Sequence, residues 1–134
     1  MENPFVVRLD VRFRDLDPMG HVNNAVYATY LEEARKAYYD AVIGVPLDDA
    51  PTVLASLDIE YRSPIGLDDA VRVEMRIRDP GGSSLPMTYE LYAGETLAAT
   101  AETVQVVIDP ETERSDAIPS AWRQRIERHR DSRQ

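Results

Sequence analysis

The sequence predicts an α+β domain in which a five-stranded antiparallel sheet wraps around one long helix, with a short helix at the C-terminus. One alternating apolar run precedes a single segment of helical periodicity, and four further alternating runs follow it. The turns between the later runs are short, which implies antiparallel pairing. The chain has 134 residues, and domains commonly contain about 100–150 residues. We therefore expect a single domain over residues 1–134.

The first predicted strand lies near the N-terminus, where apolar and charged residues alternate over residues 7–14. Alternation of this kind predicts a strand with one buried face. The inward positions of this strand are Val7, Leu9, Val11 and Phe13. A polar stretch with glycine and proline follows, and the hydrophobic period then changes.

A long helix is predicted over residues 24–42, where apolar residues recur three and four positions apart. Asn23 or Asn24 caps its start by accepting a hydrogen bond from a free first-turn N–H. Gly44 and Pro46 end it.

The two faces of this helix have different compositions. Small side chains on the face predicted to be buried let the helix lie close to a sheet; these are Ala34, Ala37 and Ala41. Ion pairs one turn apart are expected on the helix surface; these are Glu32 with Arg35, and Glu33 with Lys36.

Four strands are predicted after the helix, over residues 53–61, 71–77, 87–93 and 96–108. Turns rich in glycine, proline or acidic residues separate them. The first of these strands is predicted to direct to one face Val53, Ala55, Leu57, Ile59 and Tyr61. In the last strand the apolar phase slips near Thr103, which predicts a bulge or a strand buried on both faces.

The C-terminal helix is predicted over residues 119–130, with Ser120 as its cap and Trp122 and Ile126 as its docking residues. One long helix cannot cover both faces of a five-stranded sheet. The remaining surface is therefore expected to be solvated or buried against another copy of the chain.

Composition excludes several classes of function. The chain has no cysteine, which excludes thiolate nucleophiles and cysteine-based metal sites, and its two histidines cannot build a three-histidine zinc site. A net charge of −9 argues against nucleic-acid binding, which normally uses a basic patch. No apolar run approaches the ~20 residues of a membrane span, and the N-terminus lacks signal-peptide features. We expect a cytoplasmic protein with no membrane, nucleic-acid or metal partner.

The segment between the first strand and the long helix carries the predicted chemistry. It runs from Arg14 to Tyr27 and reads R-D-L-D-P-M-G-H-V-N-N-A-V-Y. Free N–H groups at a helix start favour negative charge and would stabilise a polarised carbonyl oxygen. A nearby carboxylate, from Asp15 or Asp17, would serve as base or nucleophile. The segment holds the groups needed to hydrolyse an activated carbonyl.

The pattern D-x-D-x-x-G-H-V-N-N-x-x-Y, opening a long helix after a first strand, resembles that of the hotdog-fold acyl-CoA thioesterases, and is most similar to the 4-hydroxybenzoyl-CoA thioesterase-like group. Residues 61–69, Y-R-S-P-I-G-L-D-D, resemble the turn between the second and third strands of that family. The resemblance covers residues 5–110. It implies a hotdog fold and hydrolysis of an acyl-CoA thioester to a free acid and CoA, without a cofactor.

Carried over residue by residue, the resemblance implies that Asp17 is the catalytic carboxylate, acting as nucleophile or general base. The backbone N–H of Asn24 would polarise the thioester carbonyl, and Gly20 would let the loop turn before the helix. The resemblance also assigns His21 and Asn23 to lining or bracing the pocket.

Three neighbouring residues have simpler or additional explanations. Asp15 is expected to be structural. His21 either acts on the substrate or only fixes the loop. Tyr27, one turn into the helix, would form the floor of the pocket.

The resemblance further implies a homodimer, or a homotetramer built from it, with two active sites along the interface. In that arrangement the partner would contribute Ser56, Arg62 and Ser63. Arginine is expected to bind the CoA phosphates, because the chain has one lysine and the guanidinium fork suits phosphate. The candidates are Arg62 and, after it, Arg123, Arg125 and Arg128.

Three alternative functions remain open at this point. A non-catalytic acyl-CoA-binding module would have no need of a carboxylate beside the thioester. A hotdog hydratase would usually carry the motif D-x-N-P-x-H, which this chain lacks. An acyl-ACP thioesterase often has asparagine where this chain has Met19, and this difference favours CoA as the carrier.

Overall fold

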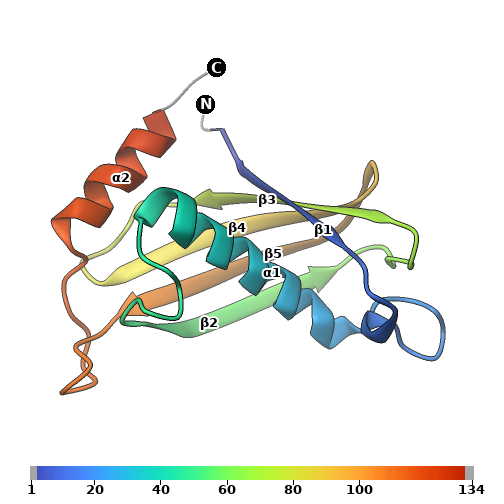
Figure 1. Cartoon of the computed structure of the whole chain (residues 1–134), viewed down its shortest axis with the longest axis horizontal. Helices are drawn as coiled ribbons and strands as arrows, with labels where there is room; N and C mark the ends of the chain where they lie inside the picture. The colour runs from blue at the N-terminus through green and yellow to red at the C-terminus, as the bar shows by residue number, and fades with distance from the viewer. Residues whose placement is uncertain (1–2, 132–134) are drawn as a thin grey trace.

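The computed structural model of the chain describes residues 3–131. One antiparallel sheet, in the order β1-β3-β4-β5-β2, curves around the long helix α1 (Figure 1). The strands are β1 (Phe5–Asp10), β2 (Thr52–Tyr61), β3 (Ala70–Ile77), β4 (Ser84–Ala93) and β5 (Thr96–Val107). The helical segments are η1 (Phe13–Asp15), α1 (Asn24–Tyr38), η2 (Tyr39–Ile43) and α2 (Ser120–Asp131). The predicted fold and order of elements are confirmed.

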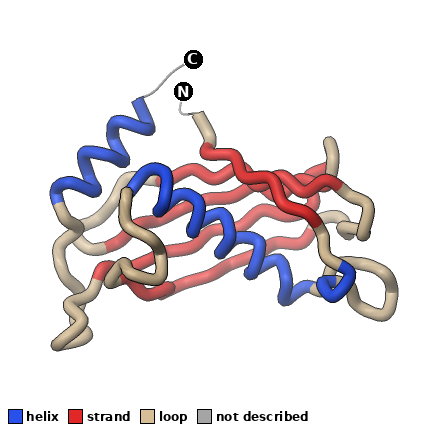
Figure 2. The backbone as a smooth tube through the Cα atoms, viewed as in Figure 1, coloured by secondary structure: helices blue, strands red, loops and turns tan. Residues whose placement is uncertain are grey.

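The core lies between α1 and one face of the sheet, which the helix crosses along its length (Figure 2). Asn23 is the residue that caps α1, because its side-chain oxygen accepts a hydrogen bond from the Ala25 N–H at 2.9 Å. Ala34 is fully buried, as the periodicity predicts. Ala41 is exposed instead, because the helix widens into the π-helical segment η2 before it ends at Gly44.

The predicted ion pairs on α1 do not form. Arg35 is 4% exposed and lies on the buried face of the helix, so it makes no pair with Glu32. Lys36 pairs with Asp40 at 3.7 Å rather than with Glu33. The helical period was predicted correctly, but an arginine was assigned to the wrong face.

The first strand ends earlier than predicted. β1 stops at Asp10, and Phe13 lies in η1 with 80% of its surface exposed. The carboxylate of Asp15 accepts a hydrogen bond from the Arg12 N–H at 2.9 Å. This contact turns the chain out of the sheet, so the alternation that continues in the sequence no longer places Phe13 in the core.

A β-bulge in β2 overturns the predicted alternation of that strand. Its register with β5 shifts between Leu54 and Ser56, which leaves Ala55 as the extra residue. A single extra residue moves all later side chains to the opposite face. Leu54 and Leu57, which pair with the buried Gln105 and Thr103 of β5, therefore share the helix-facing side.

The apparent phase slip in β5 is not a bulge at Thr103. Thr103 and Gln105 are 1% and 4% exposed and continue the series of alternate buried positions that includes Ala99, Ala101 and Val107, so they are polar side chains inside the core. The irregularity in β5 lies at Ala98, where the register with β4 shifts between Leu91 and Tyr92.

β2 forms one edge of the sheet and carries an unusual amount of exposed apolar surface. Four large apolar side chains on this strand are 43–46% exposed: Val53, Leu54, Leu57 and Tyr61. Long apolar edges invite pairing with another strand.

The C-terminal helix α2 packs against η2, at the end of the molecule opposite the loop that precedes α1 (Figure 1). Trp122 and Ile126 are 5% and 0% exposed, which confirms them as the docking residues. Within residues 3–131, no helix is both long and apolar enough to cross a membrane.

Candidate active site

The loop between η1 and α1 is closed by its own backbone. The Asp17 N–H donates to the His21 carbonyl at 2.7 Å, and the Gly20 N–H donates to the Asp17 carbonyl at 3.0 Å. Gly20 has φ +81°, a conformation that favours glycine. The tight turn therefore explains the glycine that precedes the histidine in the motif.

The carboxylate of Asp17 is held by this loop through one oxygen. Its Oδ1 accepts hydrogen bonds from the Met19 N–H at 2.9 Å and from the His21 N–H at 3.2 Å. Its Oδ2 makes no hydrogen bond within residues 3–131. The side chain is thus oriented by the backbone, and one oxygen is available for a ligand or for water.

The loop is attached to the turn between β2 and β3. The Val22 N–H donates to the Ile65 carbonyl at 2.8 Å, and His21 forms an antiparallel bridge with Gly66. These contacts bring the two segments that carry the family resemblance, residues 14–27 and 61–69, into one site.

The start of α1 offers a free donor to the same site. Asn23 caps the Ala25 N–H, but the Asn24 N–H has no acceptor in the described part of the chain. The Asn24 carbonyl accepts a hydrogen bond from the Tyr61 hydroxyl at 2.9 Å. An N–H at the positive end of a helix, with no internal partner, is suited to stabilise a developing negative charge.

These groups line one cavity of about 270 Å³. Six of the predicted site residues lie in its wall, and they are Asp17, His21, Asn24, Tyr27, Arg62 and Ser63. Val22, Tyr61 and Pro64 complete the lining. The cavity therefore combines a carboxylate, a free backbone donor and an aromatic surface.

Tyr27 forms a buried part of the wall. It is 3% exposed, its hydroxyl donates to the Ser63 carbonyl at 3.4 Å, and its ring meets the Tyr61 ring edge-on at 4.9 Å. Burial, and to a smaller extent Tyr61, raises the pKa of Tyr27, so its hydroxyl stays protonated. Tyr61 was not predicted as a site residue, although it directly precedes Arg62 and Ser63, which were.

Three predicted site residues do not line the cavity. Gly20 shapes the loop and Asn23 caps the helix. Ser56 is exposed and pairs with Val104 of β5, so it lies on the face of the sheet away from α1.

The arginines proposed for phosphate binding are divided between the two ends of the molecule. Arg62 lies at the cavity and pairs with Glu60 at 3.2 Å, with both side chains exposed. Arg123 and Arg125 on α2 donate to backbone carbonyls of residues 81 and 43, each at 2.6 Å. They brace α2 far from the Asp17 loop within one chain (Figure 1).

Asp15 is structural, as the sequence analysis expected. It is 3% exposed, and its Oδ2 accepts from the Tyr30 hydroxyl at 2.8 Å as well as from the Arg12 N–H. Burial, followed by the hydrogen bond to Asp15, raises the pKa of Tyr30. Asp15 therefore fastens η1 to α1.

Replacing Tyr30 with phenylalanine is expected to lower the free energy of unfolding by about 1–3 kcal/mol, because a buried carboxylate oxygen loses a donor. Chemical denaturation measures the change. Tyr92→Phe is the control, since its hydroxyl makes only a 3.4 Å hydrogen bond to Glu90 on a partly exposed surface. Equal stability of the two variants would contradict the role given to Tyr30.

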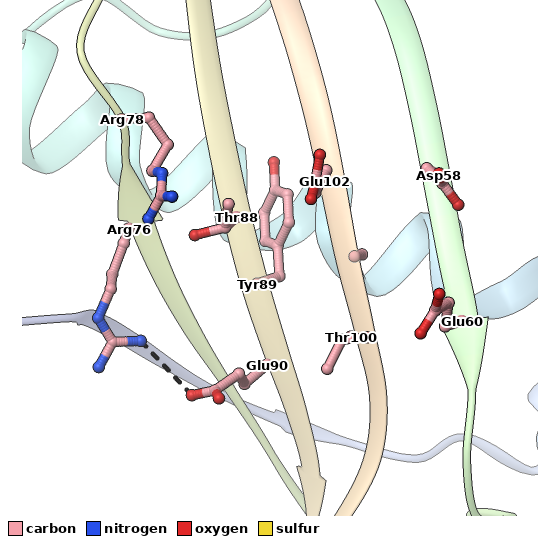
Figure 3. Close-up of a pocket in the computed structure, with 10 residues that line it drawn as sticks. Asp58, Glu60, Arg76, Arg78, Thr88, Tyr89, Glu90, Thr100 and Glu102 are labelled. Carbon is pink, nitrogen blue, oxygen red and sulfur yellow. Dashed lines mark hydrogen bonds and ion pairs between the residues drawn. The ribbon is translucent and has the colours of Figure 1, made fainter.

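A second hollow lies on the outer face of the sheet, among polar side chains of β2 to β5 (Figure 3). Arg76 and Glu90 pair across it at 3.5 Å. It contains none of the predicted site residues. Among residues 3–131, no group of three or more histidine or acidic side chains is arranged to hold a metal ion.

Comparison with known proteins places this chain in a family. The model of the Thioesterase-like superfamily matches residues 11–126. The long-chain acyl-CoA thioesterase FadM of Escherichia coli is 29% identical over an alignment of 125 residues that covers 90% of this chain and 95% of that protein. A thioesterase from Thermus thermophilus, solved with coenzyme A and Zn, is 38% identical with a TM-score of 0.89, covering 99% of this chain and 98% of that one. The 1,4-dihydroxy-2-naphthoyl-CoA thioesterase Slr0204 from Synechocystis shares the fold, with a TM-score of 0.84 at 21% identity over 91% of this chain and 94% of that one. The chain belongs to the Thioesterase-like superfamily and is a thioester hydrolase of the hotdog fold.

Proposed function

We propose that the protein hydrolyses acyl-CoA thioesters at the cavity beside Asp17. The observation that carries this proposal is the pairing of two available groups in one cavity: the free Oδ2 of Asp17 and the free N–H of Asn24. The Asp17 oxygen can activate water or attack a carbonyl carbon, and the Asn24 N–H can donate a hydrogen bond to the carbonyl oxygen. The relative named as a long-chain acyl-CoA thioesterase, and the Thermus relative solved with coenzyme A, support CoA as the carrier.

Two reaction routes can use these groups. As a general base, Asp17 takes a proton from water while the water oxygen bonds to the carbonyl carbon; the C–S bond then breaks and the proton passes to the thiolate. As a nucleophile, Asp17 bonds to the carbonyl carbon and the C–S bond breaks as the thiolate leaves. Water then cleaves the mixed anhydride and regenerates the Asp17 carboxylate, with one water proton ending on the thiol and the other on the free acid. In both routes the Asn24 N–H stabilises the negative carbonyl oxygen.

A single turnover in H₂¹⁸O can give a labelled Asp17 carboxylate, a result that only the nucleophilic route produces. If Asp17 is the nucleophile and water attacks the Asp17 side of the anhydride, ¹⁸O enters the Asp17 carboxylate. If Asp17 is the base, all of the ¹⁸O leaves in the free acid. Mass spectrometry of the peptide that contains Asp17 measures the label after one turnover with excess enzyme.

Release of free thiol from a panel of acyl-CoAs tests the activity itself. Turnover on at least one acyl-CoA supports the proposal. Saturable binding without thiol release would favour the acyl-CoA-binding module. Release from acyl-ACP alone would favour the acyl-ACP thioesterase.

The functional unit in this proposal is a homodimer paired along β2. The argument rests on the exposed apolar side chains of that edge strand and on the tendency of such edges to pair. A two-fold axis closes the pairing and leaves no further β2 edge exposed.

Arg62 is the proposed contact for the CoA phosphates, since it lines the cavity and its guanidinium is exposed. Arg62→Ala is expected to raise KM for acyl-CoA about 5- to 20-fold, because a charge-assisted hydrogen bond to phosphate is lost. kcat should change little. Arg114→Ala, an exposed arginine outside the cavity, is the control. Equal KM values for Arg62→Ala and wild type would remove Arg62 from the site.

A further inference from the structure

Arg35 is a buried cation whose charge is not balanced by any ion pair within residues 3–131. It is 4% exposed, and its Nη1 donates to the Tyr89 hydroxyl at the long distance of 3.4 Å. Its Nε has no hydrogen-bond partner, and none of the ion pairs among residues 3–131 includes it. Burying a charge without a counter-charge is costly. A counter-charge from outside residues 3–131 would therefore stabilise this site.

The buried groups beside the Arg35 guanidinium, on β4, β5 and the start of β2, are polar but uncharged. The Tyr89 hydroxyl shares a 2.6 Å hydrogen bond with Thr103, and the Gln105 side chain donates to the Thr52 hydroxyl at 3.1 Å. Burial raises the pKa of Tyr89 and Arg35 partly opposes that rise, so the tyrosine stays neutral. These groups build a polar pocket around the guanidinium without cancelling its charge.

Arg35 opens on a cavity of about 530 Å³ between the C-terminal half of α1 and the start of β2. Thr52, Leu54 and Gln105 form part of its wall. The carboxylates at its rim, Glu32, Glu33 and Asp48, are exposed and screened by water, whereas the guanidinium lies at depth. The depth of the cavity therefore favours an anionic group.

Within one chain, Arg35 cannot reach a thioester carbonyl bound at the Asn24 N–H. The two residues are eleven positions apart on the same helix, which is about 16 Å at 1.5 Å per residue. The cavity beside Arg35 and the cavity beside Asp17 lie toward opposite ends of α1.

Pairing of β2 with a second copy brings the two kinds of cavity together. In an antiparallel pair centred on this strand, the Thr52 end of one β2 lies beside the Tyr61 end of the other. Thr52 and Leu54 line the Arg35 cavity, and Tyr61 lines the Asp17 cavity. In such a dimer, each Arg35 cavity would adjoin the Asp17 cavity of the other subunit.

We propose that Arg35 completes the active site of the partner subunit and binds a carboxylate at the far end of the acyl group. The acyl group extends from the thioester, held beside Asp17 of one subunit, into the Arg35 cavity of the other. A guanidinium with free donors is the natural complement of a carboxylate. The substrate class is therefore a dicarboxylic acyl-CoA. This inference rests on the proposed function and on pairing along β2.

Matched substrates of equal carbon number test the substrate class: succinyl- against butyryl-CoA, adipoyl- against hexanoyl-CoA, and suberoyl- against octanoyl-CoA. Wild type is expected to prefer the dicarboxylic member of at least one pair. Arg35→Gln should lower kcat/KM for that member by about 10- to 100-fold, the effect of one lost charge-assisted interaction. The same substitution should lower kcat/KM for the monocarboxylic member of the pair by less than about 3-fold. If Arg35 has a purely structural role, Arg35→Gln will lower kcat/KM equally for both members of a pair. That result would overturn the inference.

Mixed dimers, purified by two different tags, test whether Arg35 acts in the partner's site. The first dimer combines an Asp17→Asn chain with an Arg35→Gln chain, and the second combines a wild-type chain with a chain carrying both substitutions. Both contain the same two substitutions, so any loss of stability is matched. If Arg35 acts across the interface, the first retains about half of the wild-type activity on the dicarboxylic substrate and the second shows the Arg35→Gln deficit. The inference would be overturned if the second dimer retained about half of the wild-type activity and the first showed the Arg35→Gln deficit.

These outcomes are separable from a failure of the proposed function. Full activity of the Asp17→Asn homodimer would remove the catalytic role of Asp17 and leave the preference data standing. A wild-type enzyme that hydrolyses acyl-CoAs but prefers no dicarboxylic substrate would overturn the inference about Arg35 and leave the proposed function intact.

Discussion

Replacing Asp17 with asparagine is expected to lower kcat for acyl-CoA hydrolysis by about 10²- to 10⁴-fold, the usual effect of losing a general base or nucleophile. The substitution tests chemistry rather than folding. The amide oxygen of asparagine can still accept the hydrogen bonds that Oδ1 accepts from the Met19 and His21 N–H groups. The free Oδ2 is replaced by an amide nitrogen, which is neither basic nor nucleophilic. Steady-state thiol release measures the loss, and circular dichroism checks the fold.

Asp109→Asn is the matched control for this experiment. The Oδ1 of Asp109 accepts a hydrogen bond from the Glu111 N–H at 2.9 Å, two residues along the chain, just as Asp17 does from Met19. Asp109 lies outside the cavity, so its substitution should leave kcat unchanged. If Asp17→Asn keeps more than about a tenth of the wild-type kcat, the assignment of the reaction to Asp17 is wrong.

Replacing Leu57 with lysine is expected to give a monomer near 15.1 kDa that has lost thioesterase activity. Leu57 is 43% exposed in the middle of the β2 edge, where pairing with a second copy would bury it. A lysine there places an unpaired charge in the interface, which should raise the dimer dissociation constant by about 10²-fold or more. Light scattering at the assay concentration measures the mass alongside the activity.

Val6→Lys provides the comparison on the opposite edge of the sheet. Val6 is 38% exposed on β1, so the change in side chain and in exposure is similar, but β1 is not the proposed interface. This variant should remain dimeric and active. A fully active monomer of Leu57→Lys would contradict both the dimer along β2 and the shared site.

The loop and its aspartate could be predicted from sequence because their geometry is local. The contacts that hold Asp17 come from Met19 and His21, within four residues of it, and the turn depends on the φ of Gly20. The free N–H of Asn24 follows from its place at the first turn of a helix. Each of these features is written in consecutive residues.

Arg62 and Ser63 illustrate the limit of that reasoning. The sequence analysis named them as site residues but expected them to arrive from the partner. The structure brings them to Asp17 in the same chain, because His21 and Val22 pair with the turn that contains Ile65 and Gly66. A contact across more than forty residues depends on the docking of two loops, which neither loop shows by itself.

The succession of strands and helices along the chain and the turn of the Asp17 loop could be predicted from sequence alone, since hydrophobic period and turn chemistry act between near neighbours. Tertiary structure decided which way several side chains point. The bulge at Ala55 depends on the register of β2 against β5. Thr103 can be buried because its hydroxyl forms a hydrogen bond with the Tyr89 hydroxyl of β4. Arg35 also faces inward, where the Tyr89 hydroxyl of β4 accepts a hydrogen bond from its Nη1 and the adjoining cavity leaves room for a further partner. A polar side chain enters a core only where distant elements supply its partners, and those partners are known only once the chain is folded.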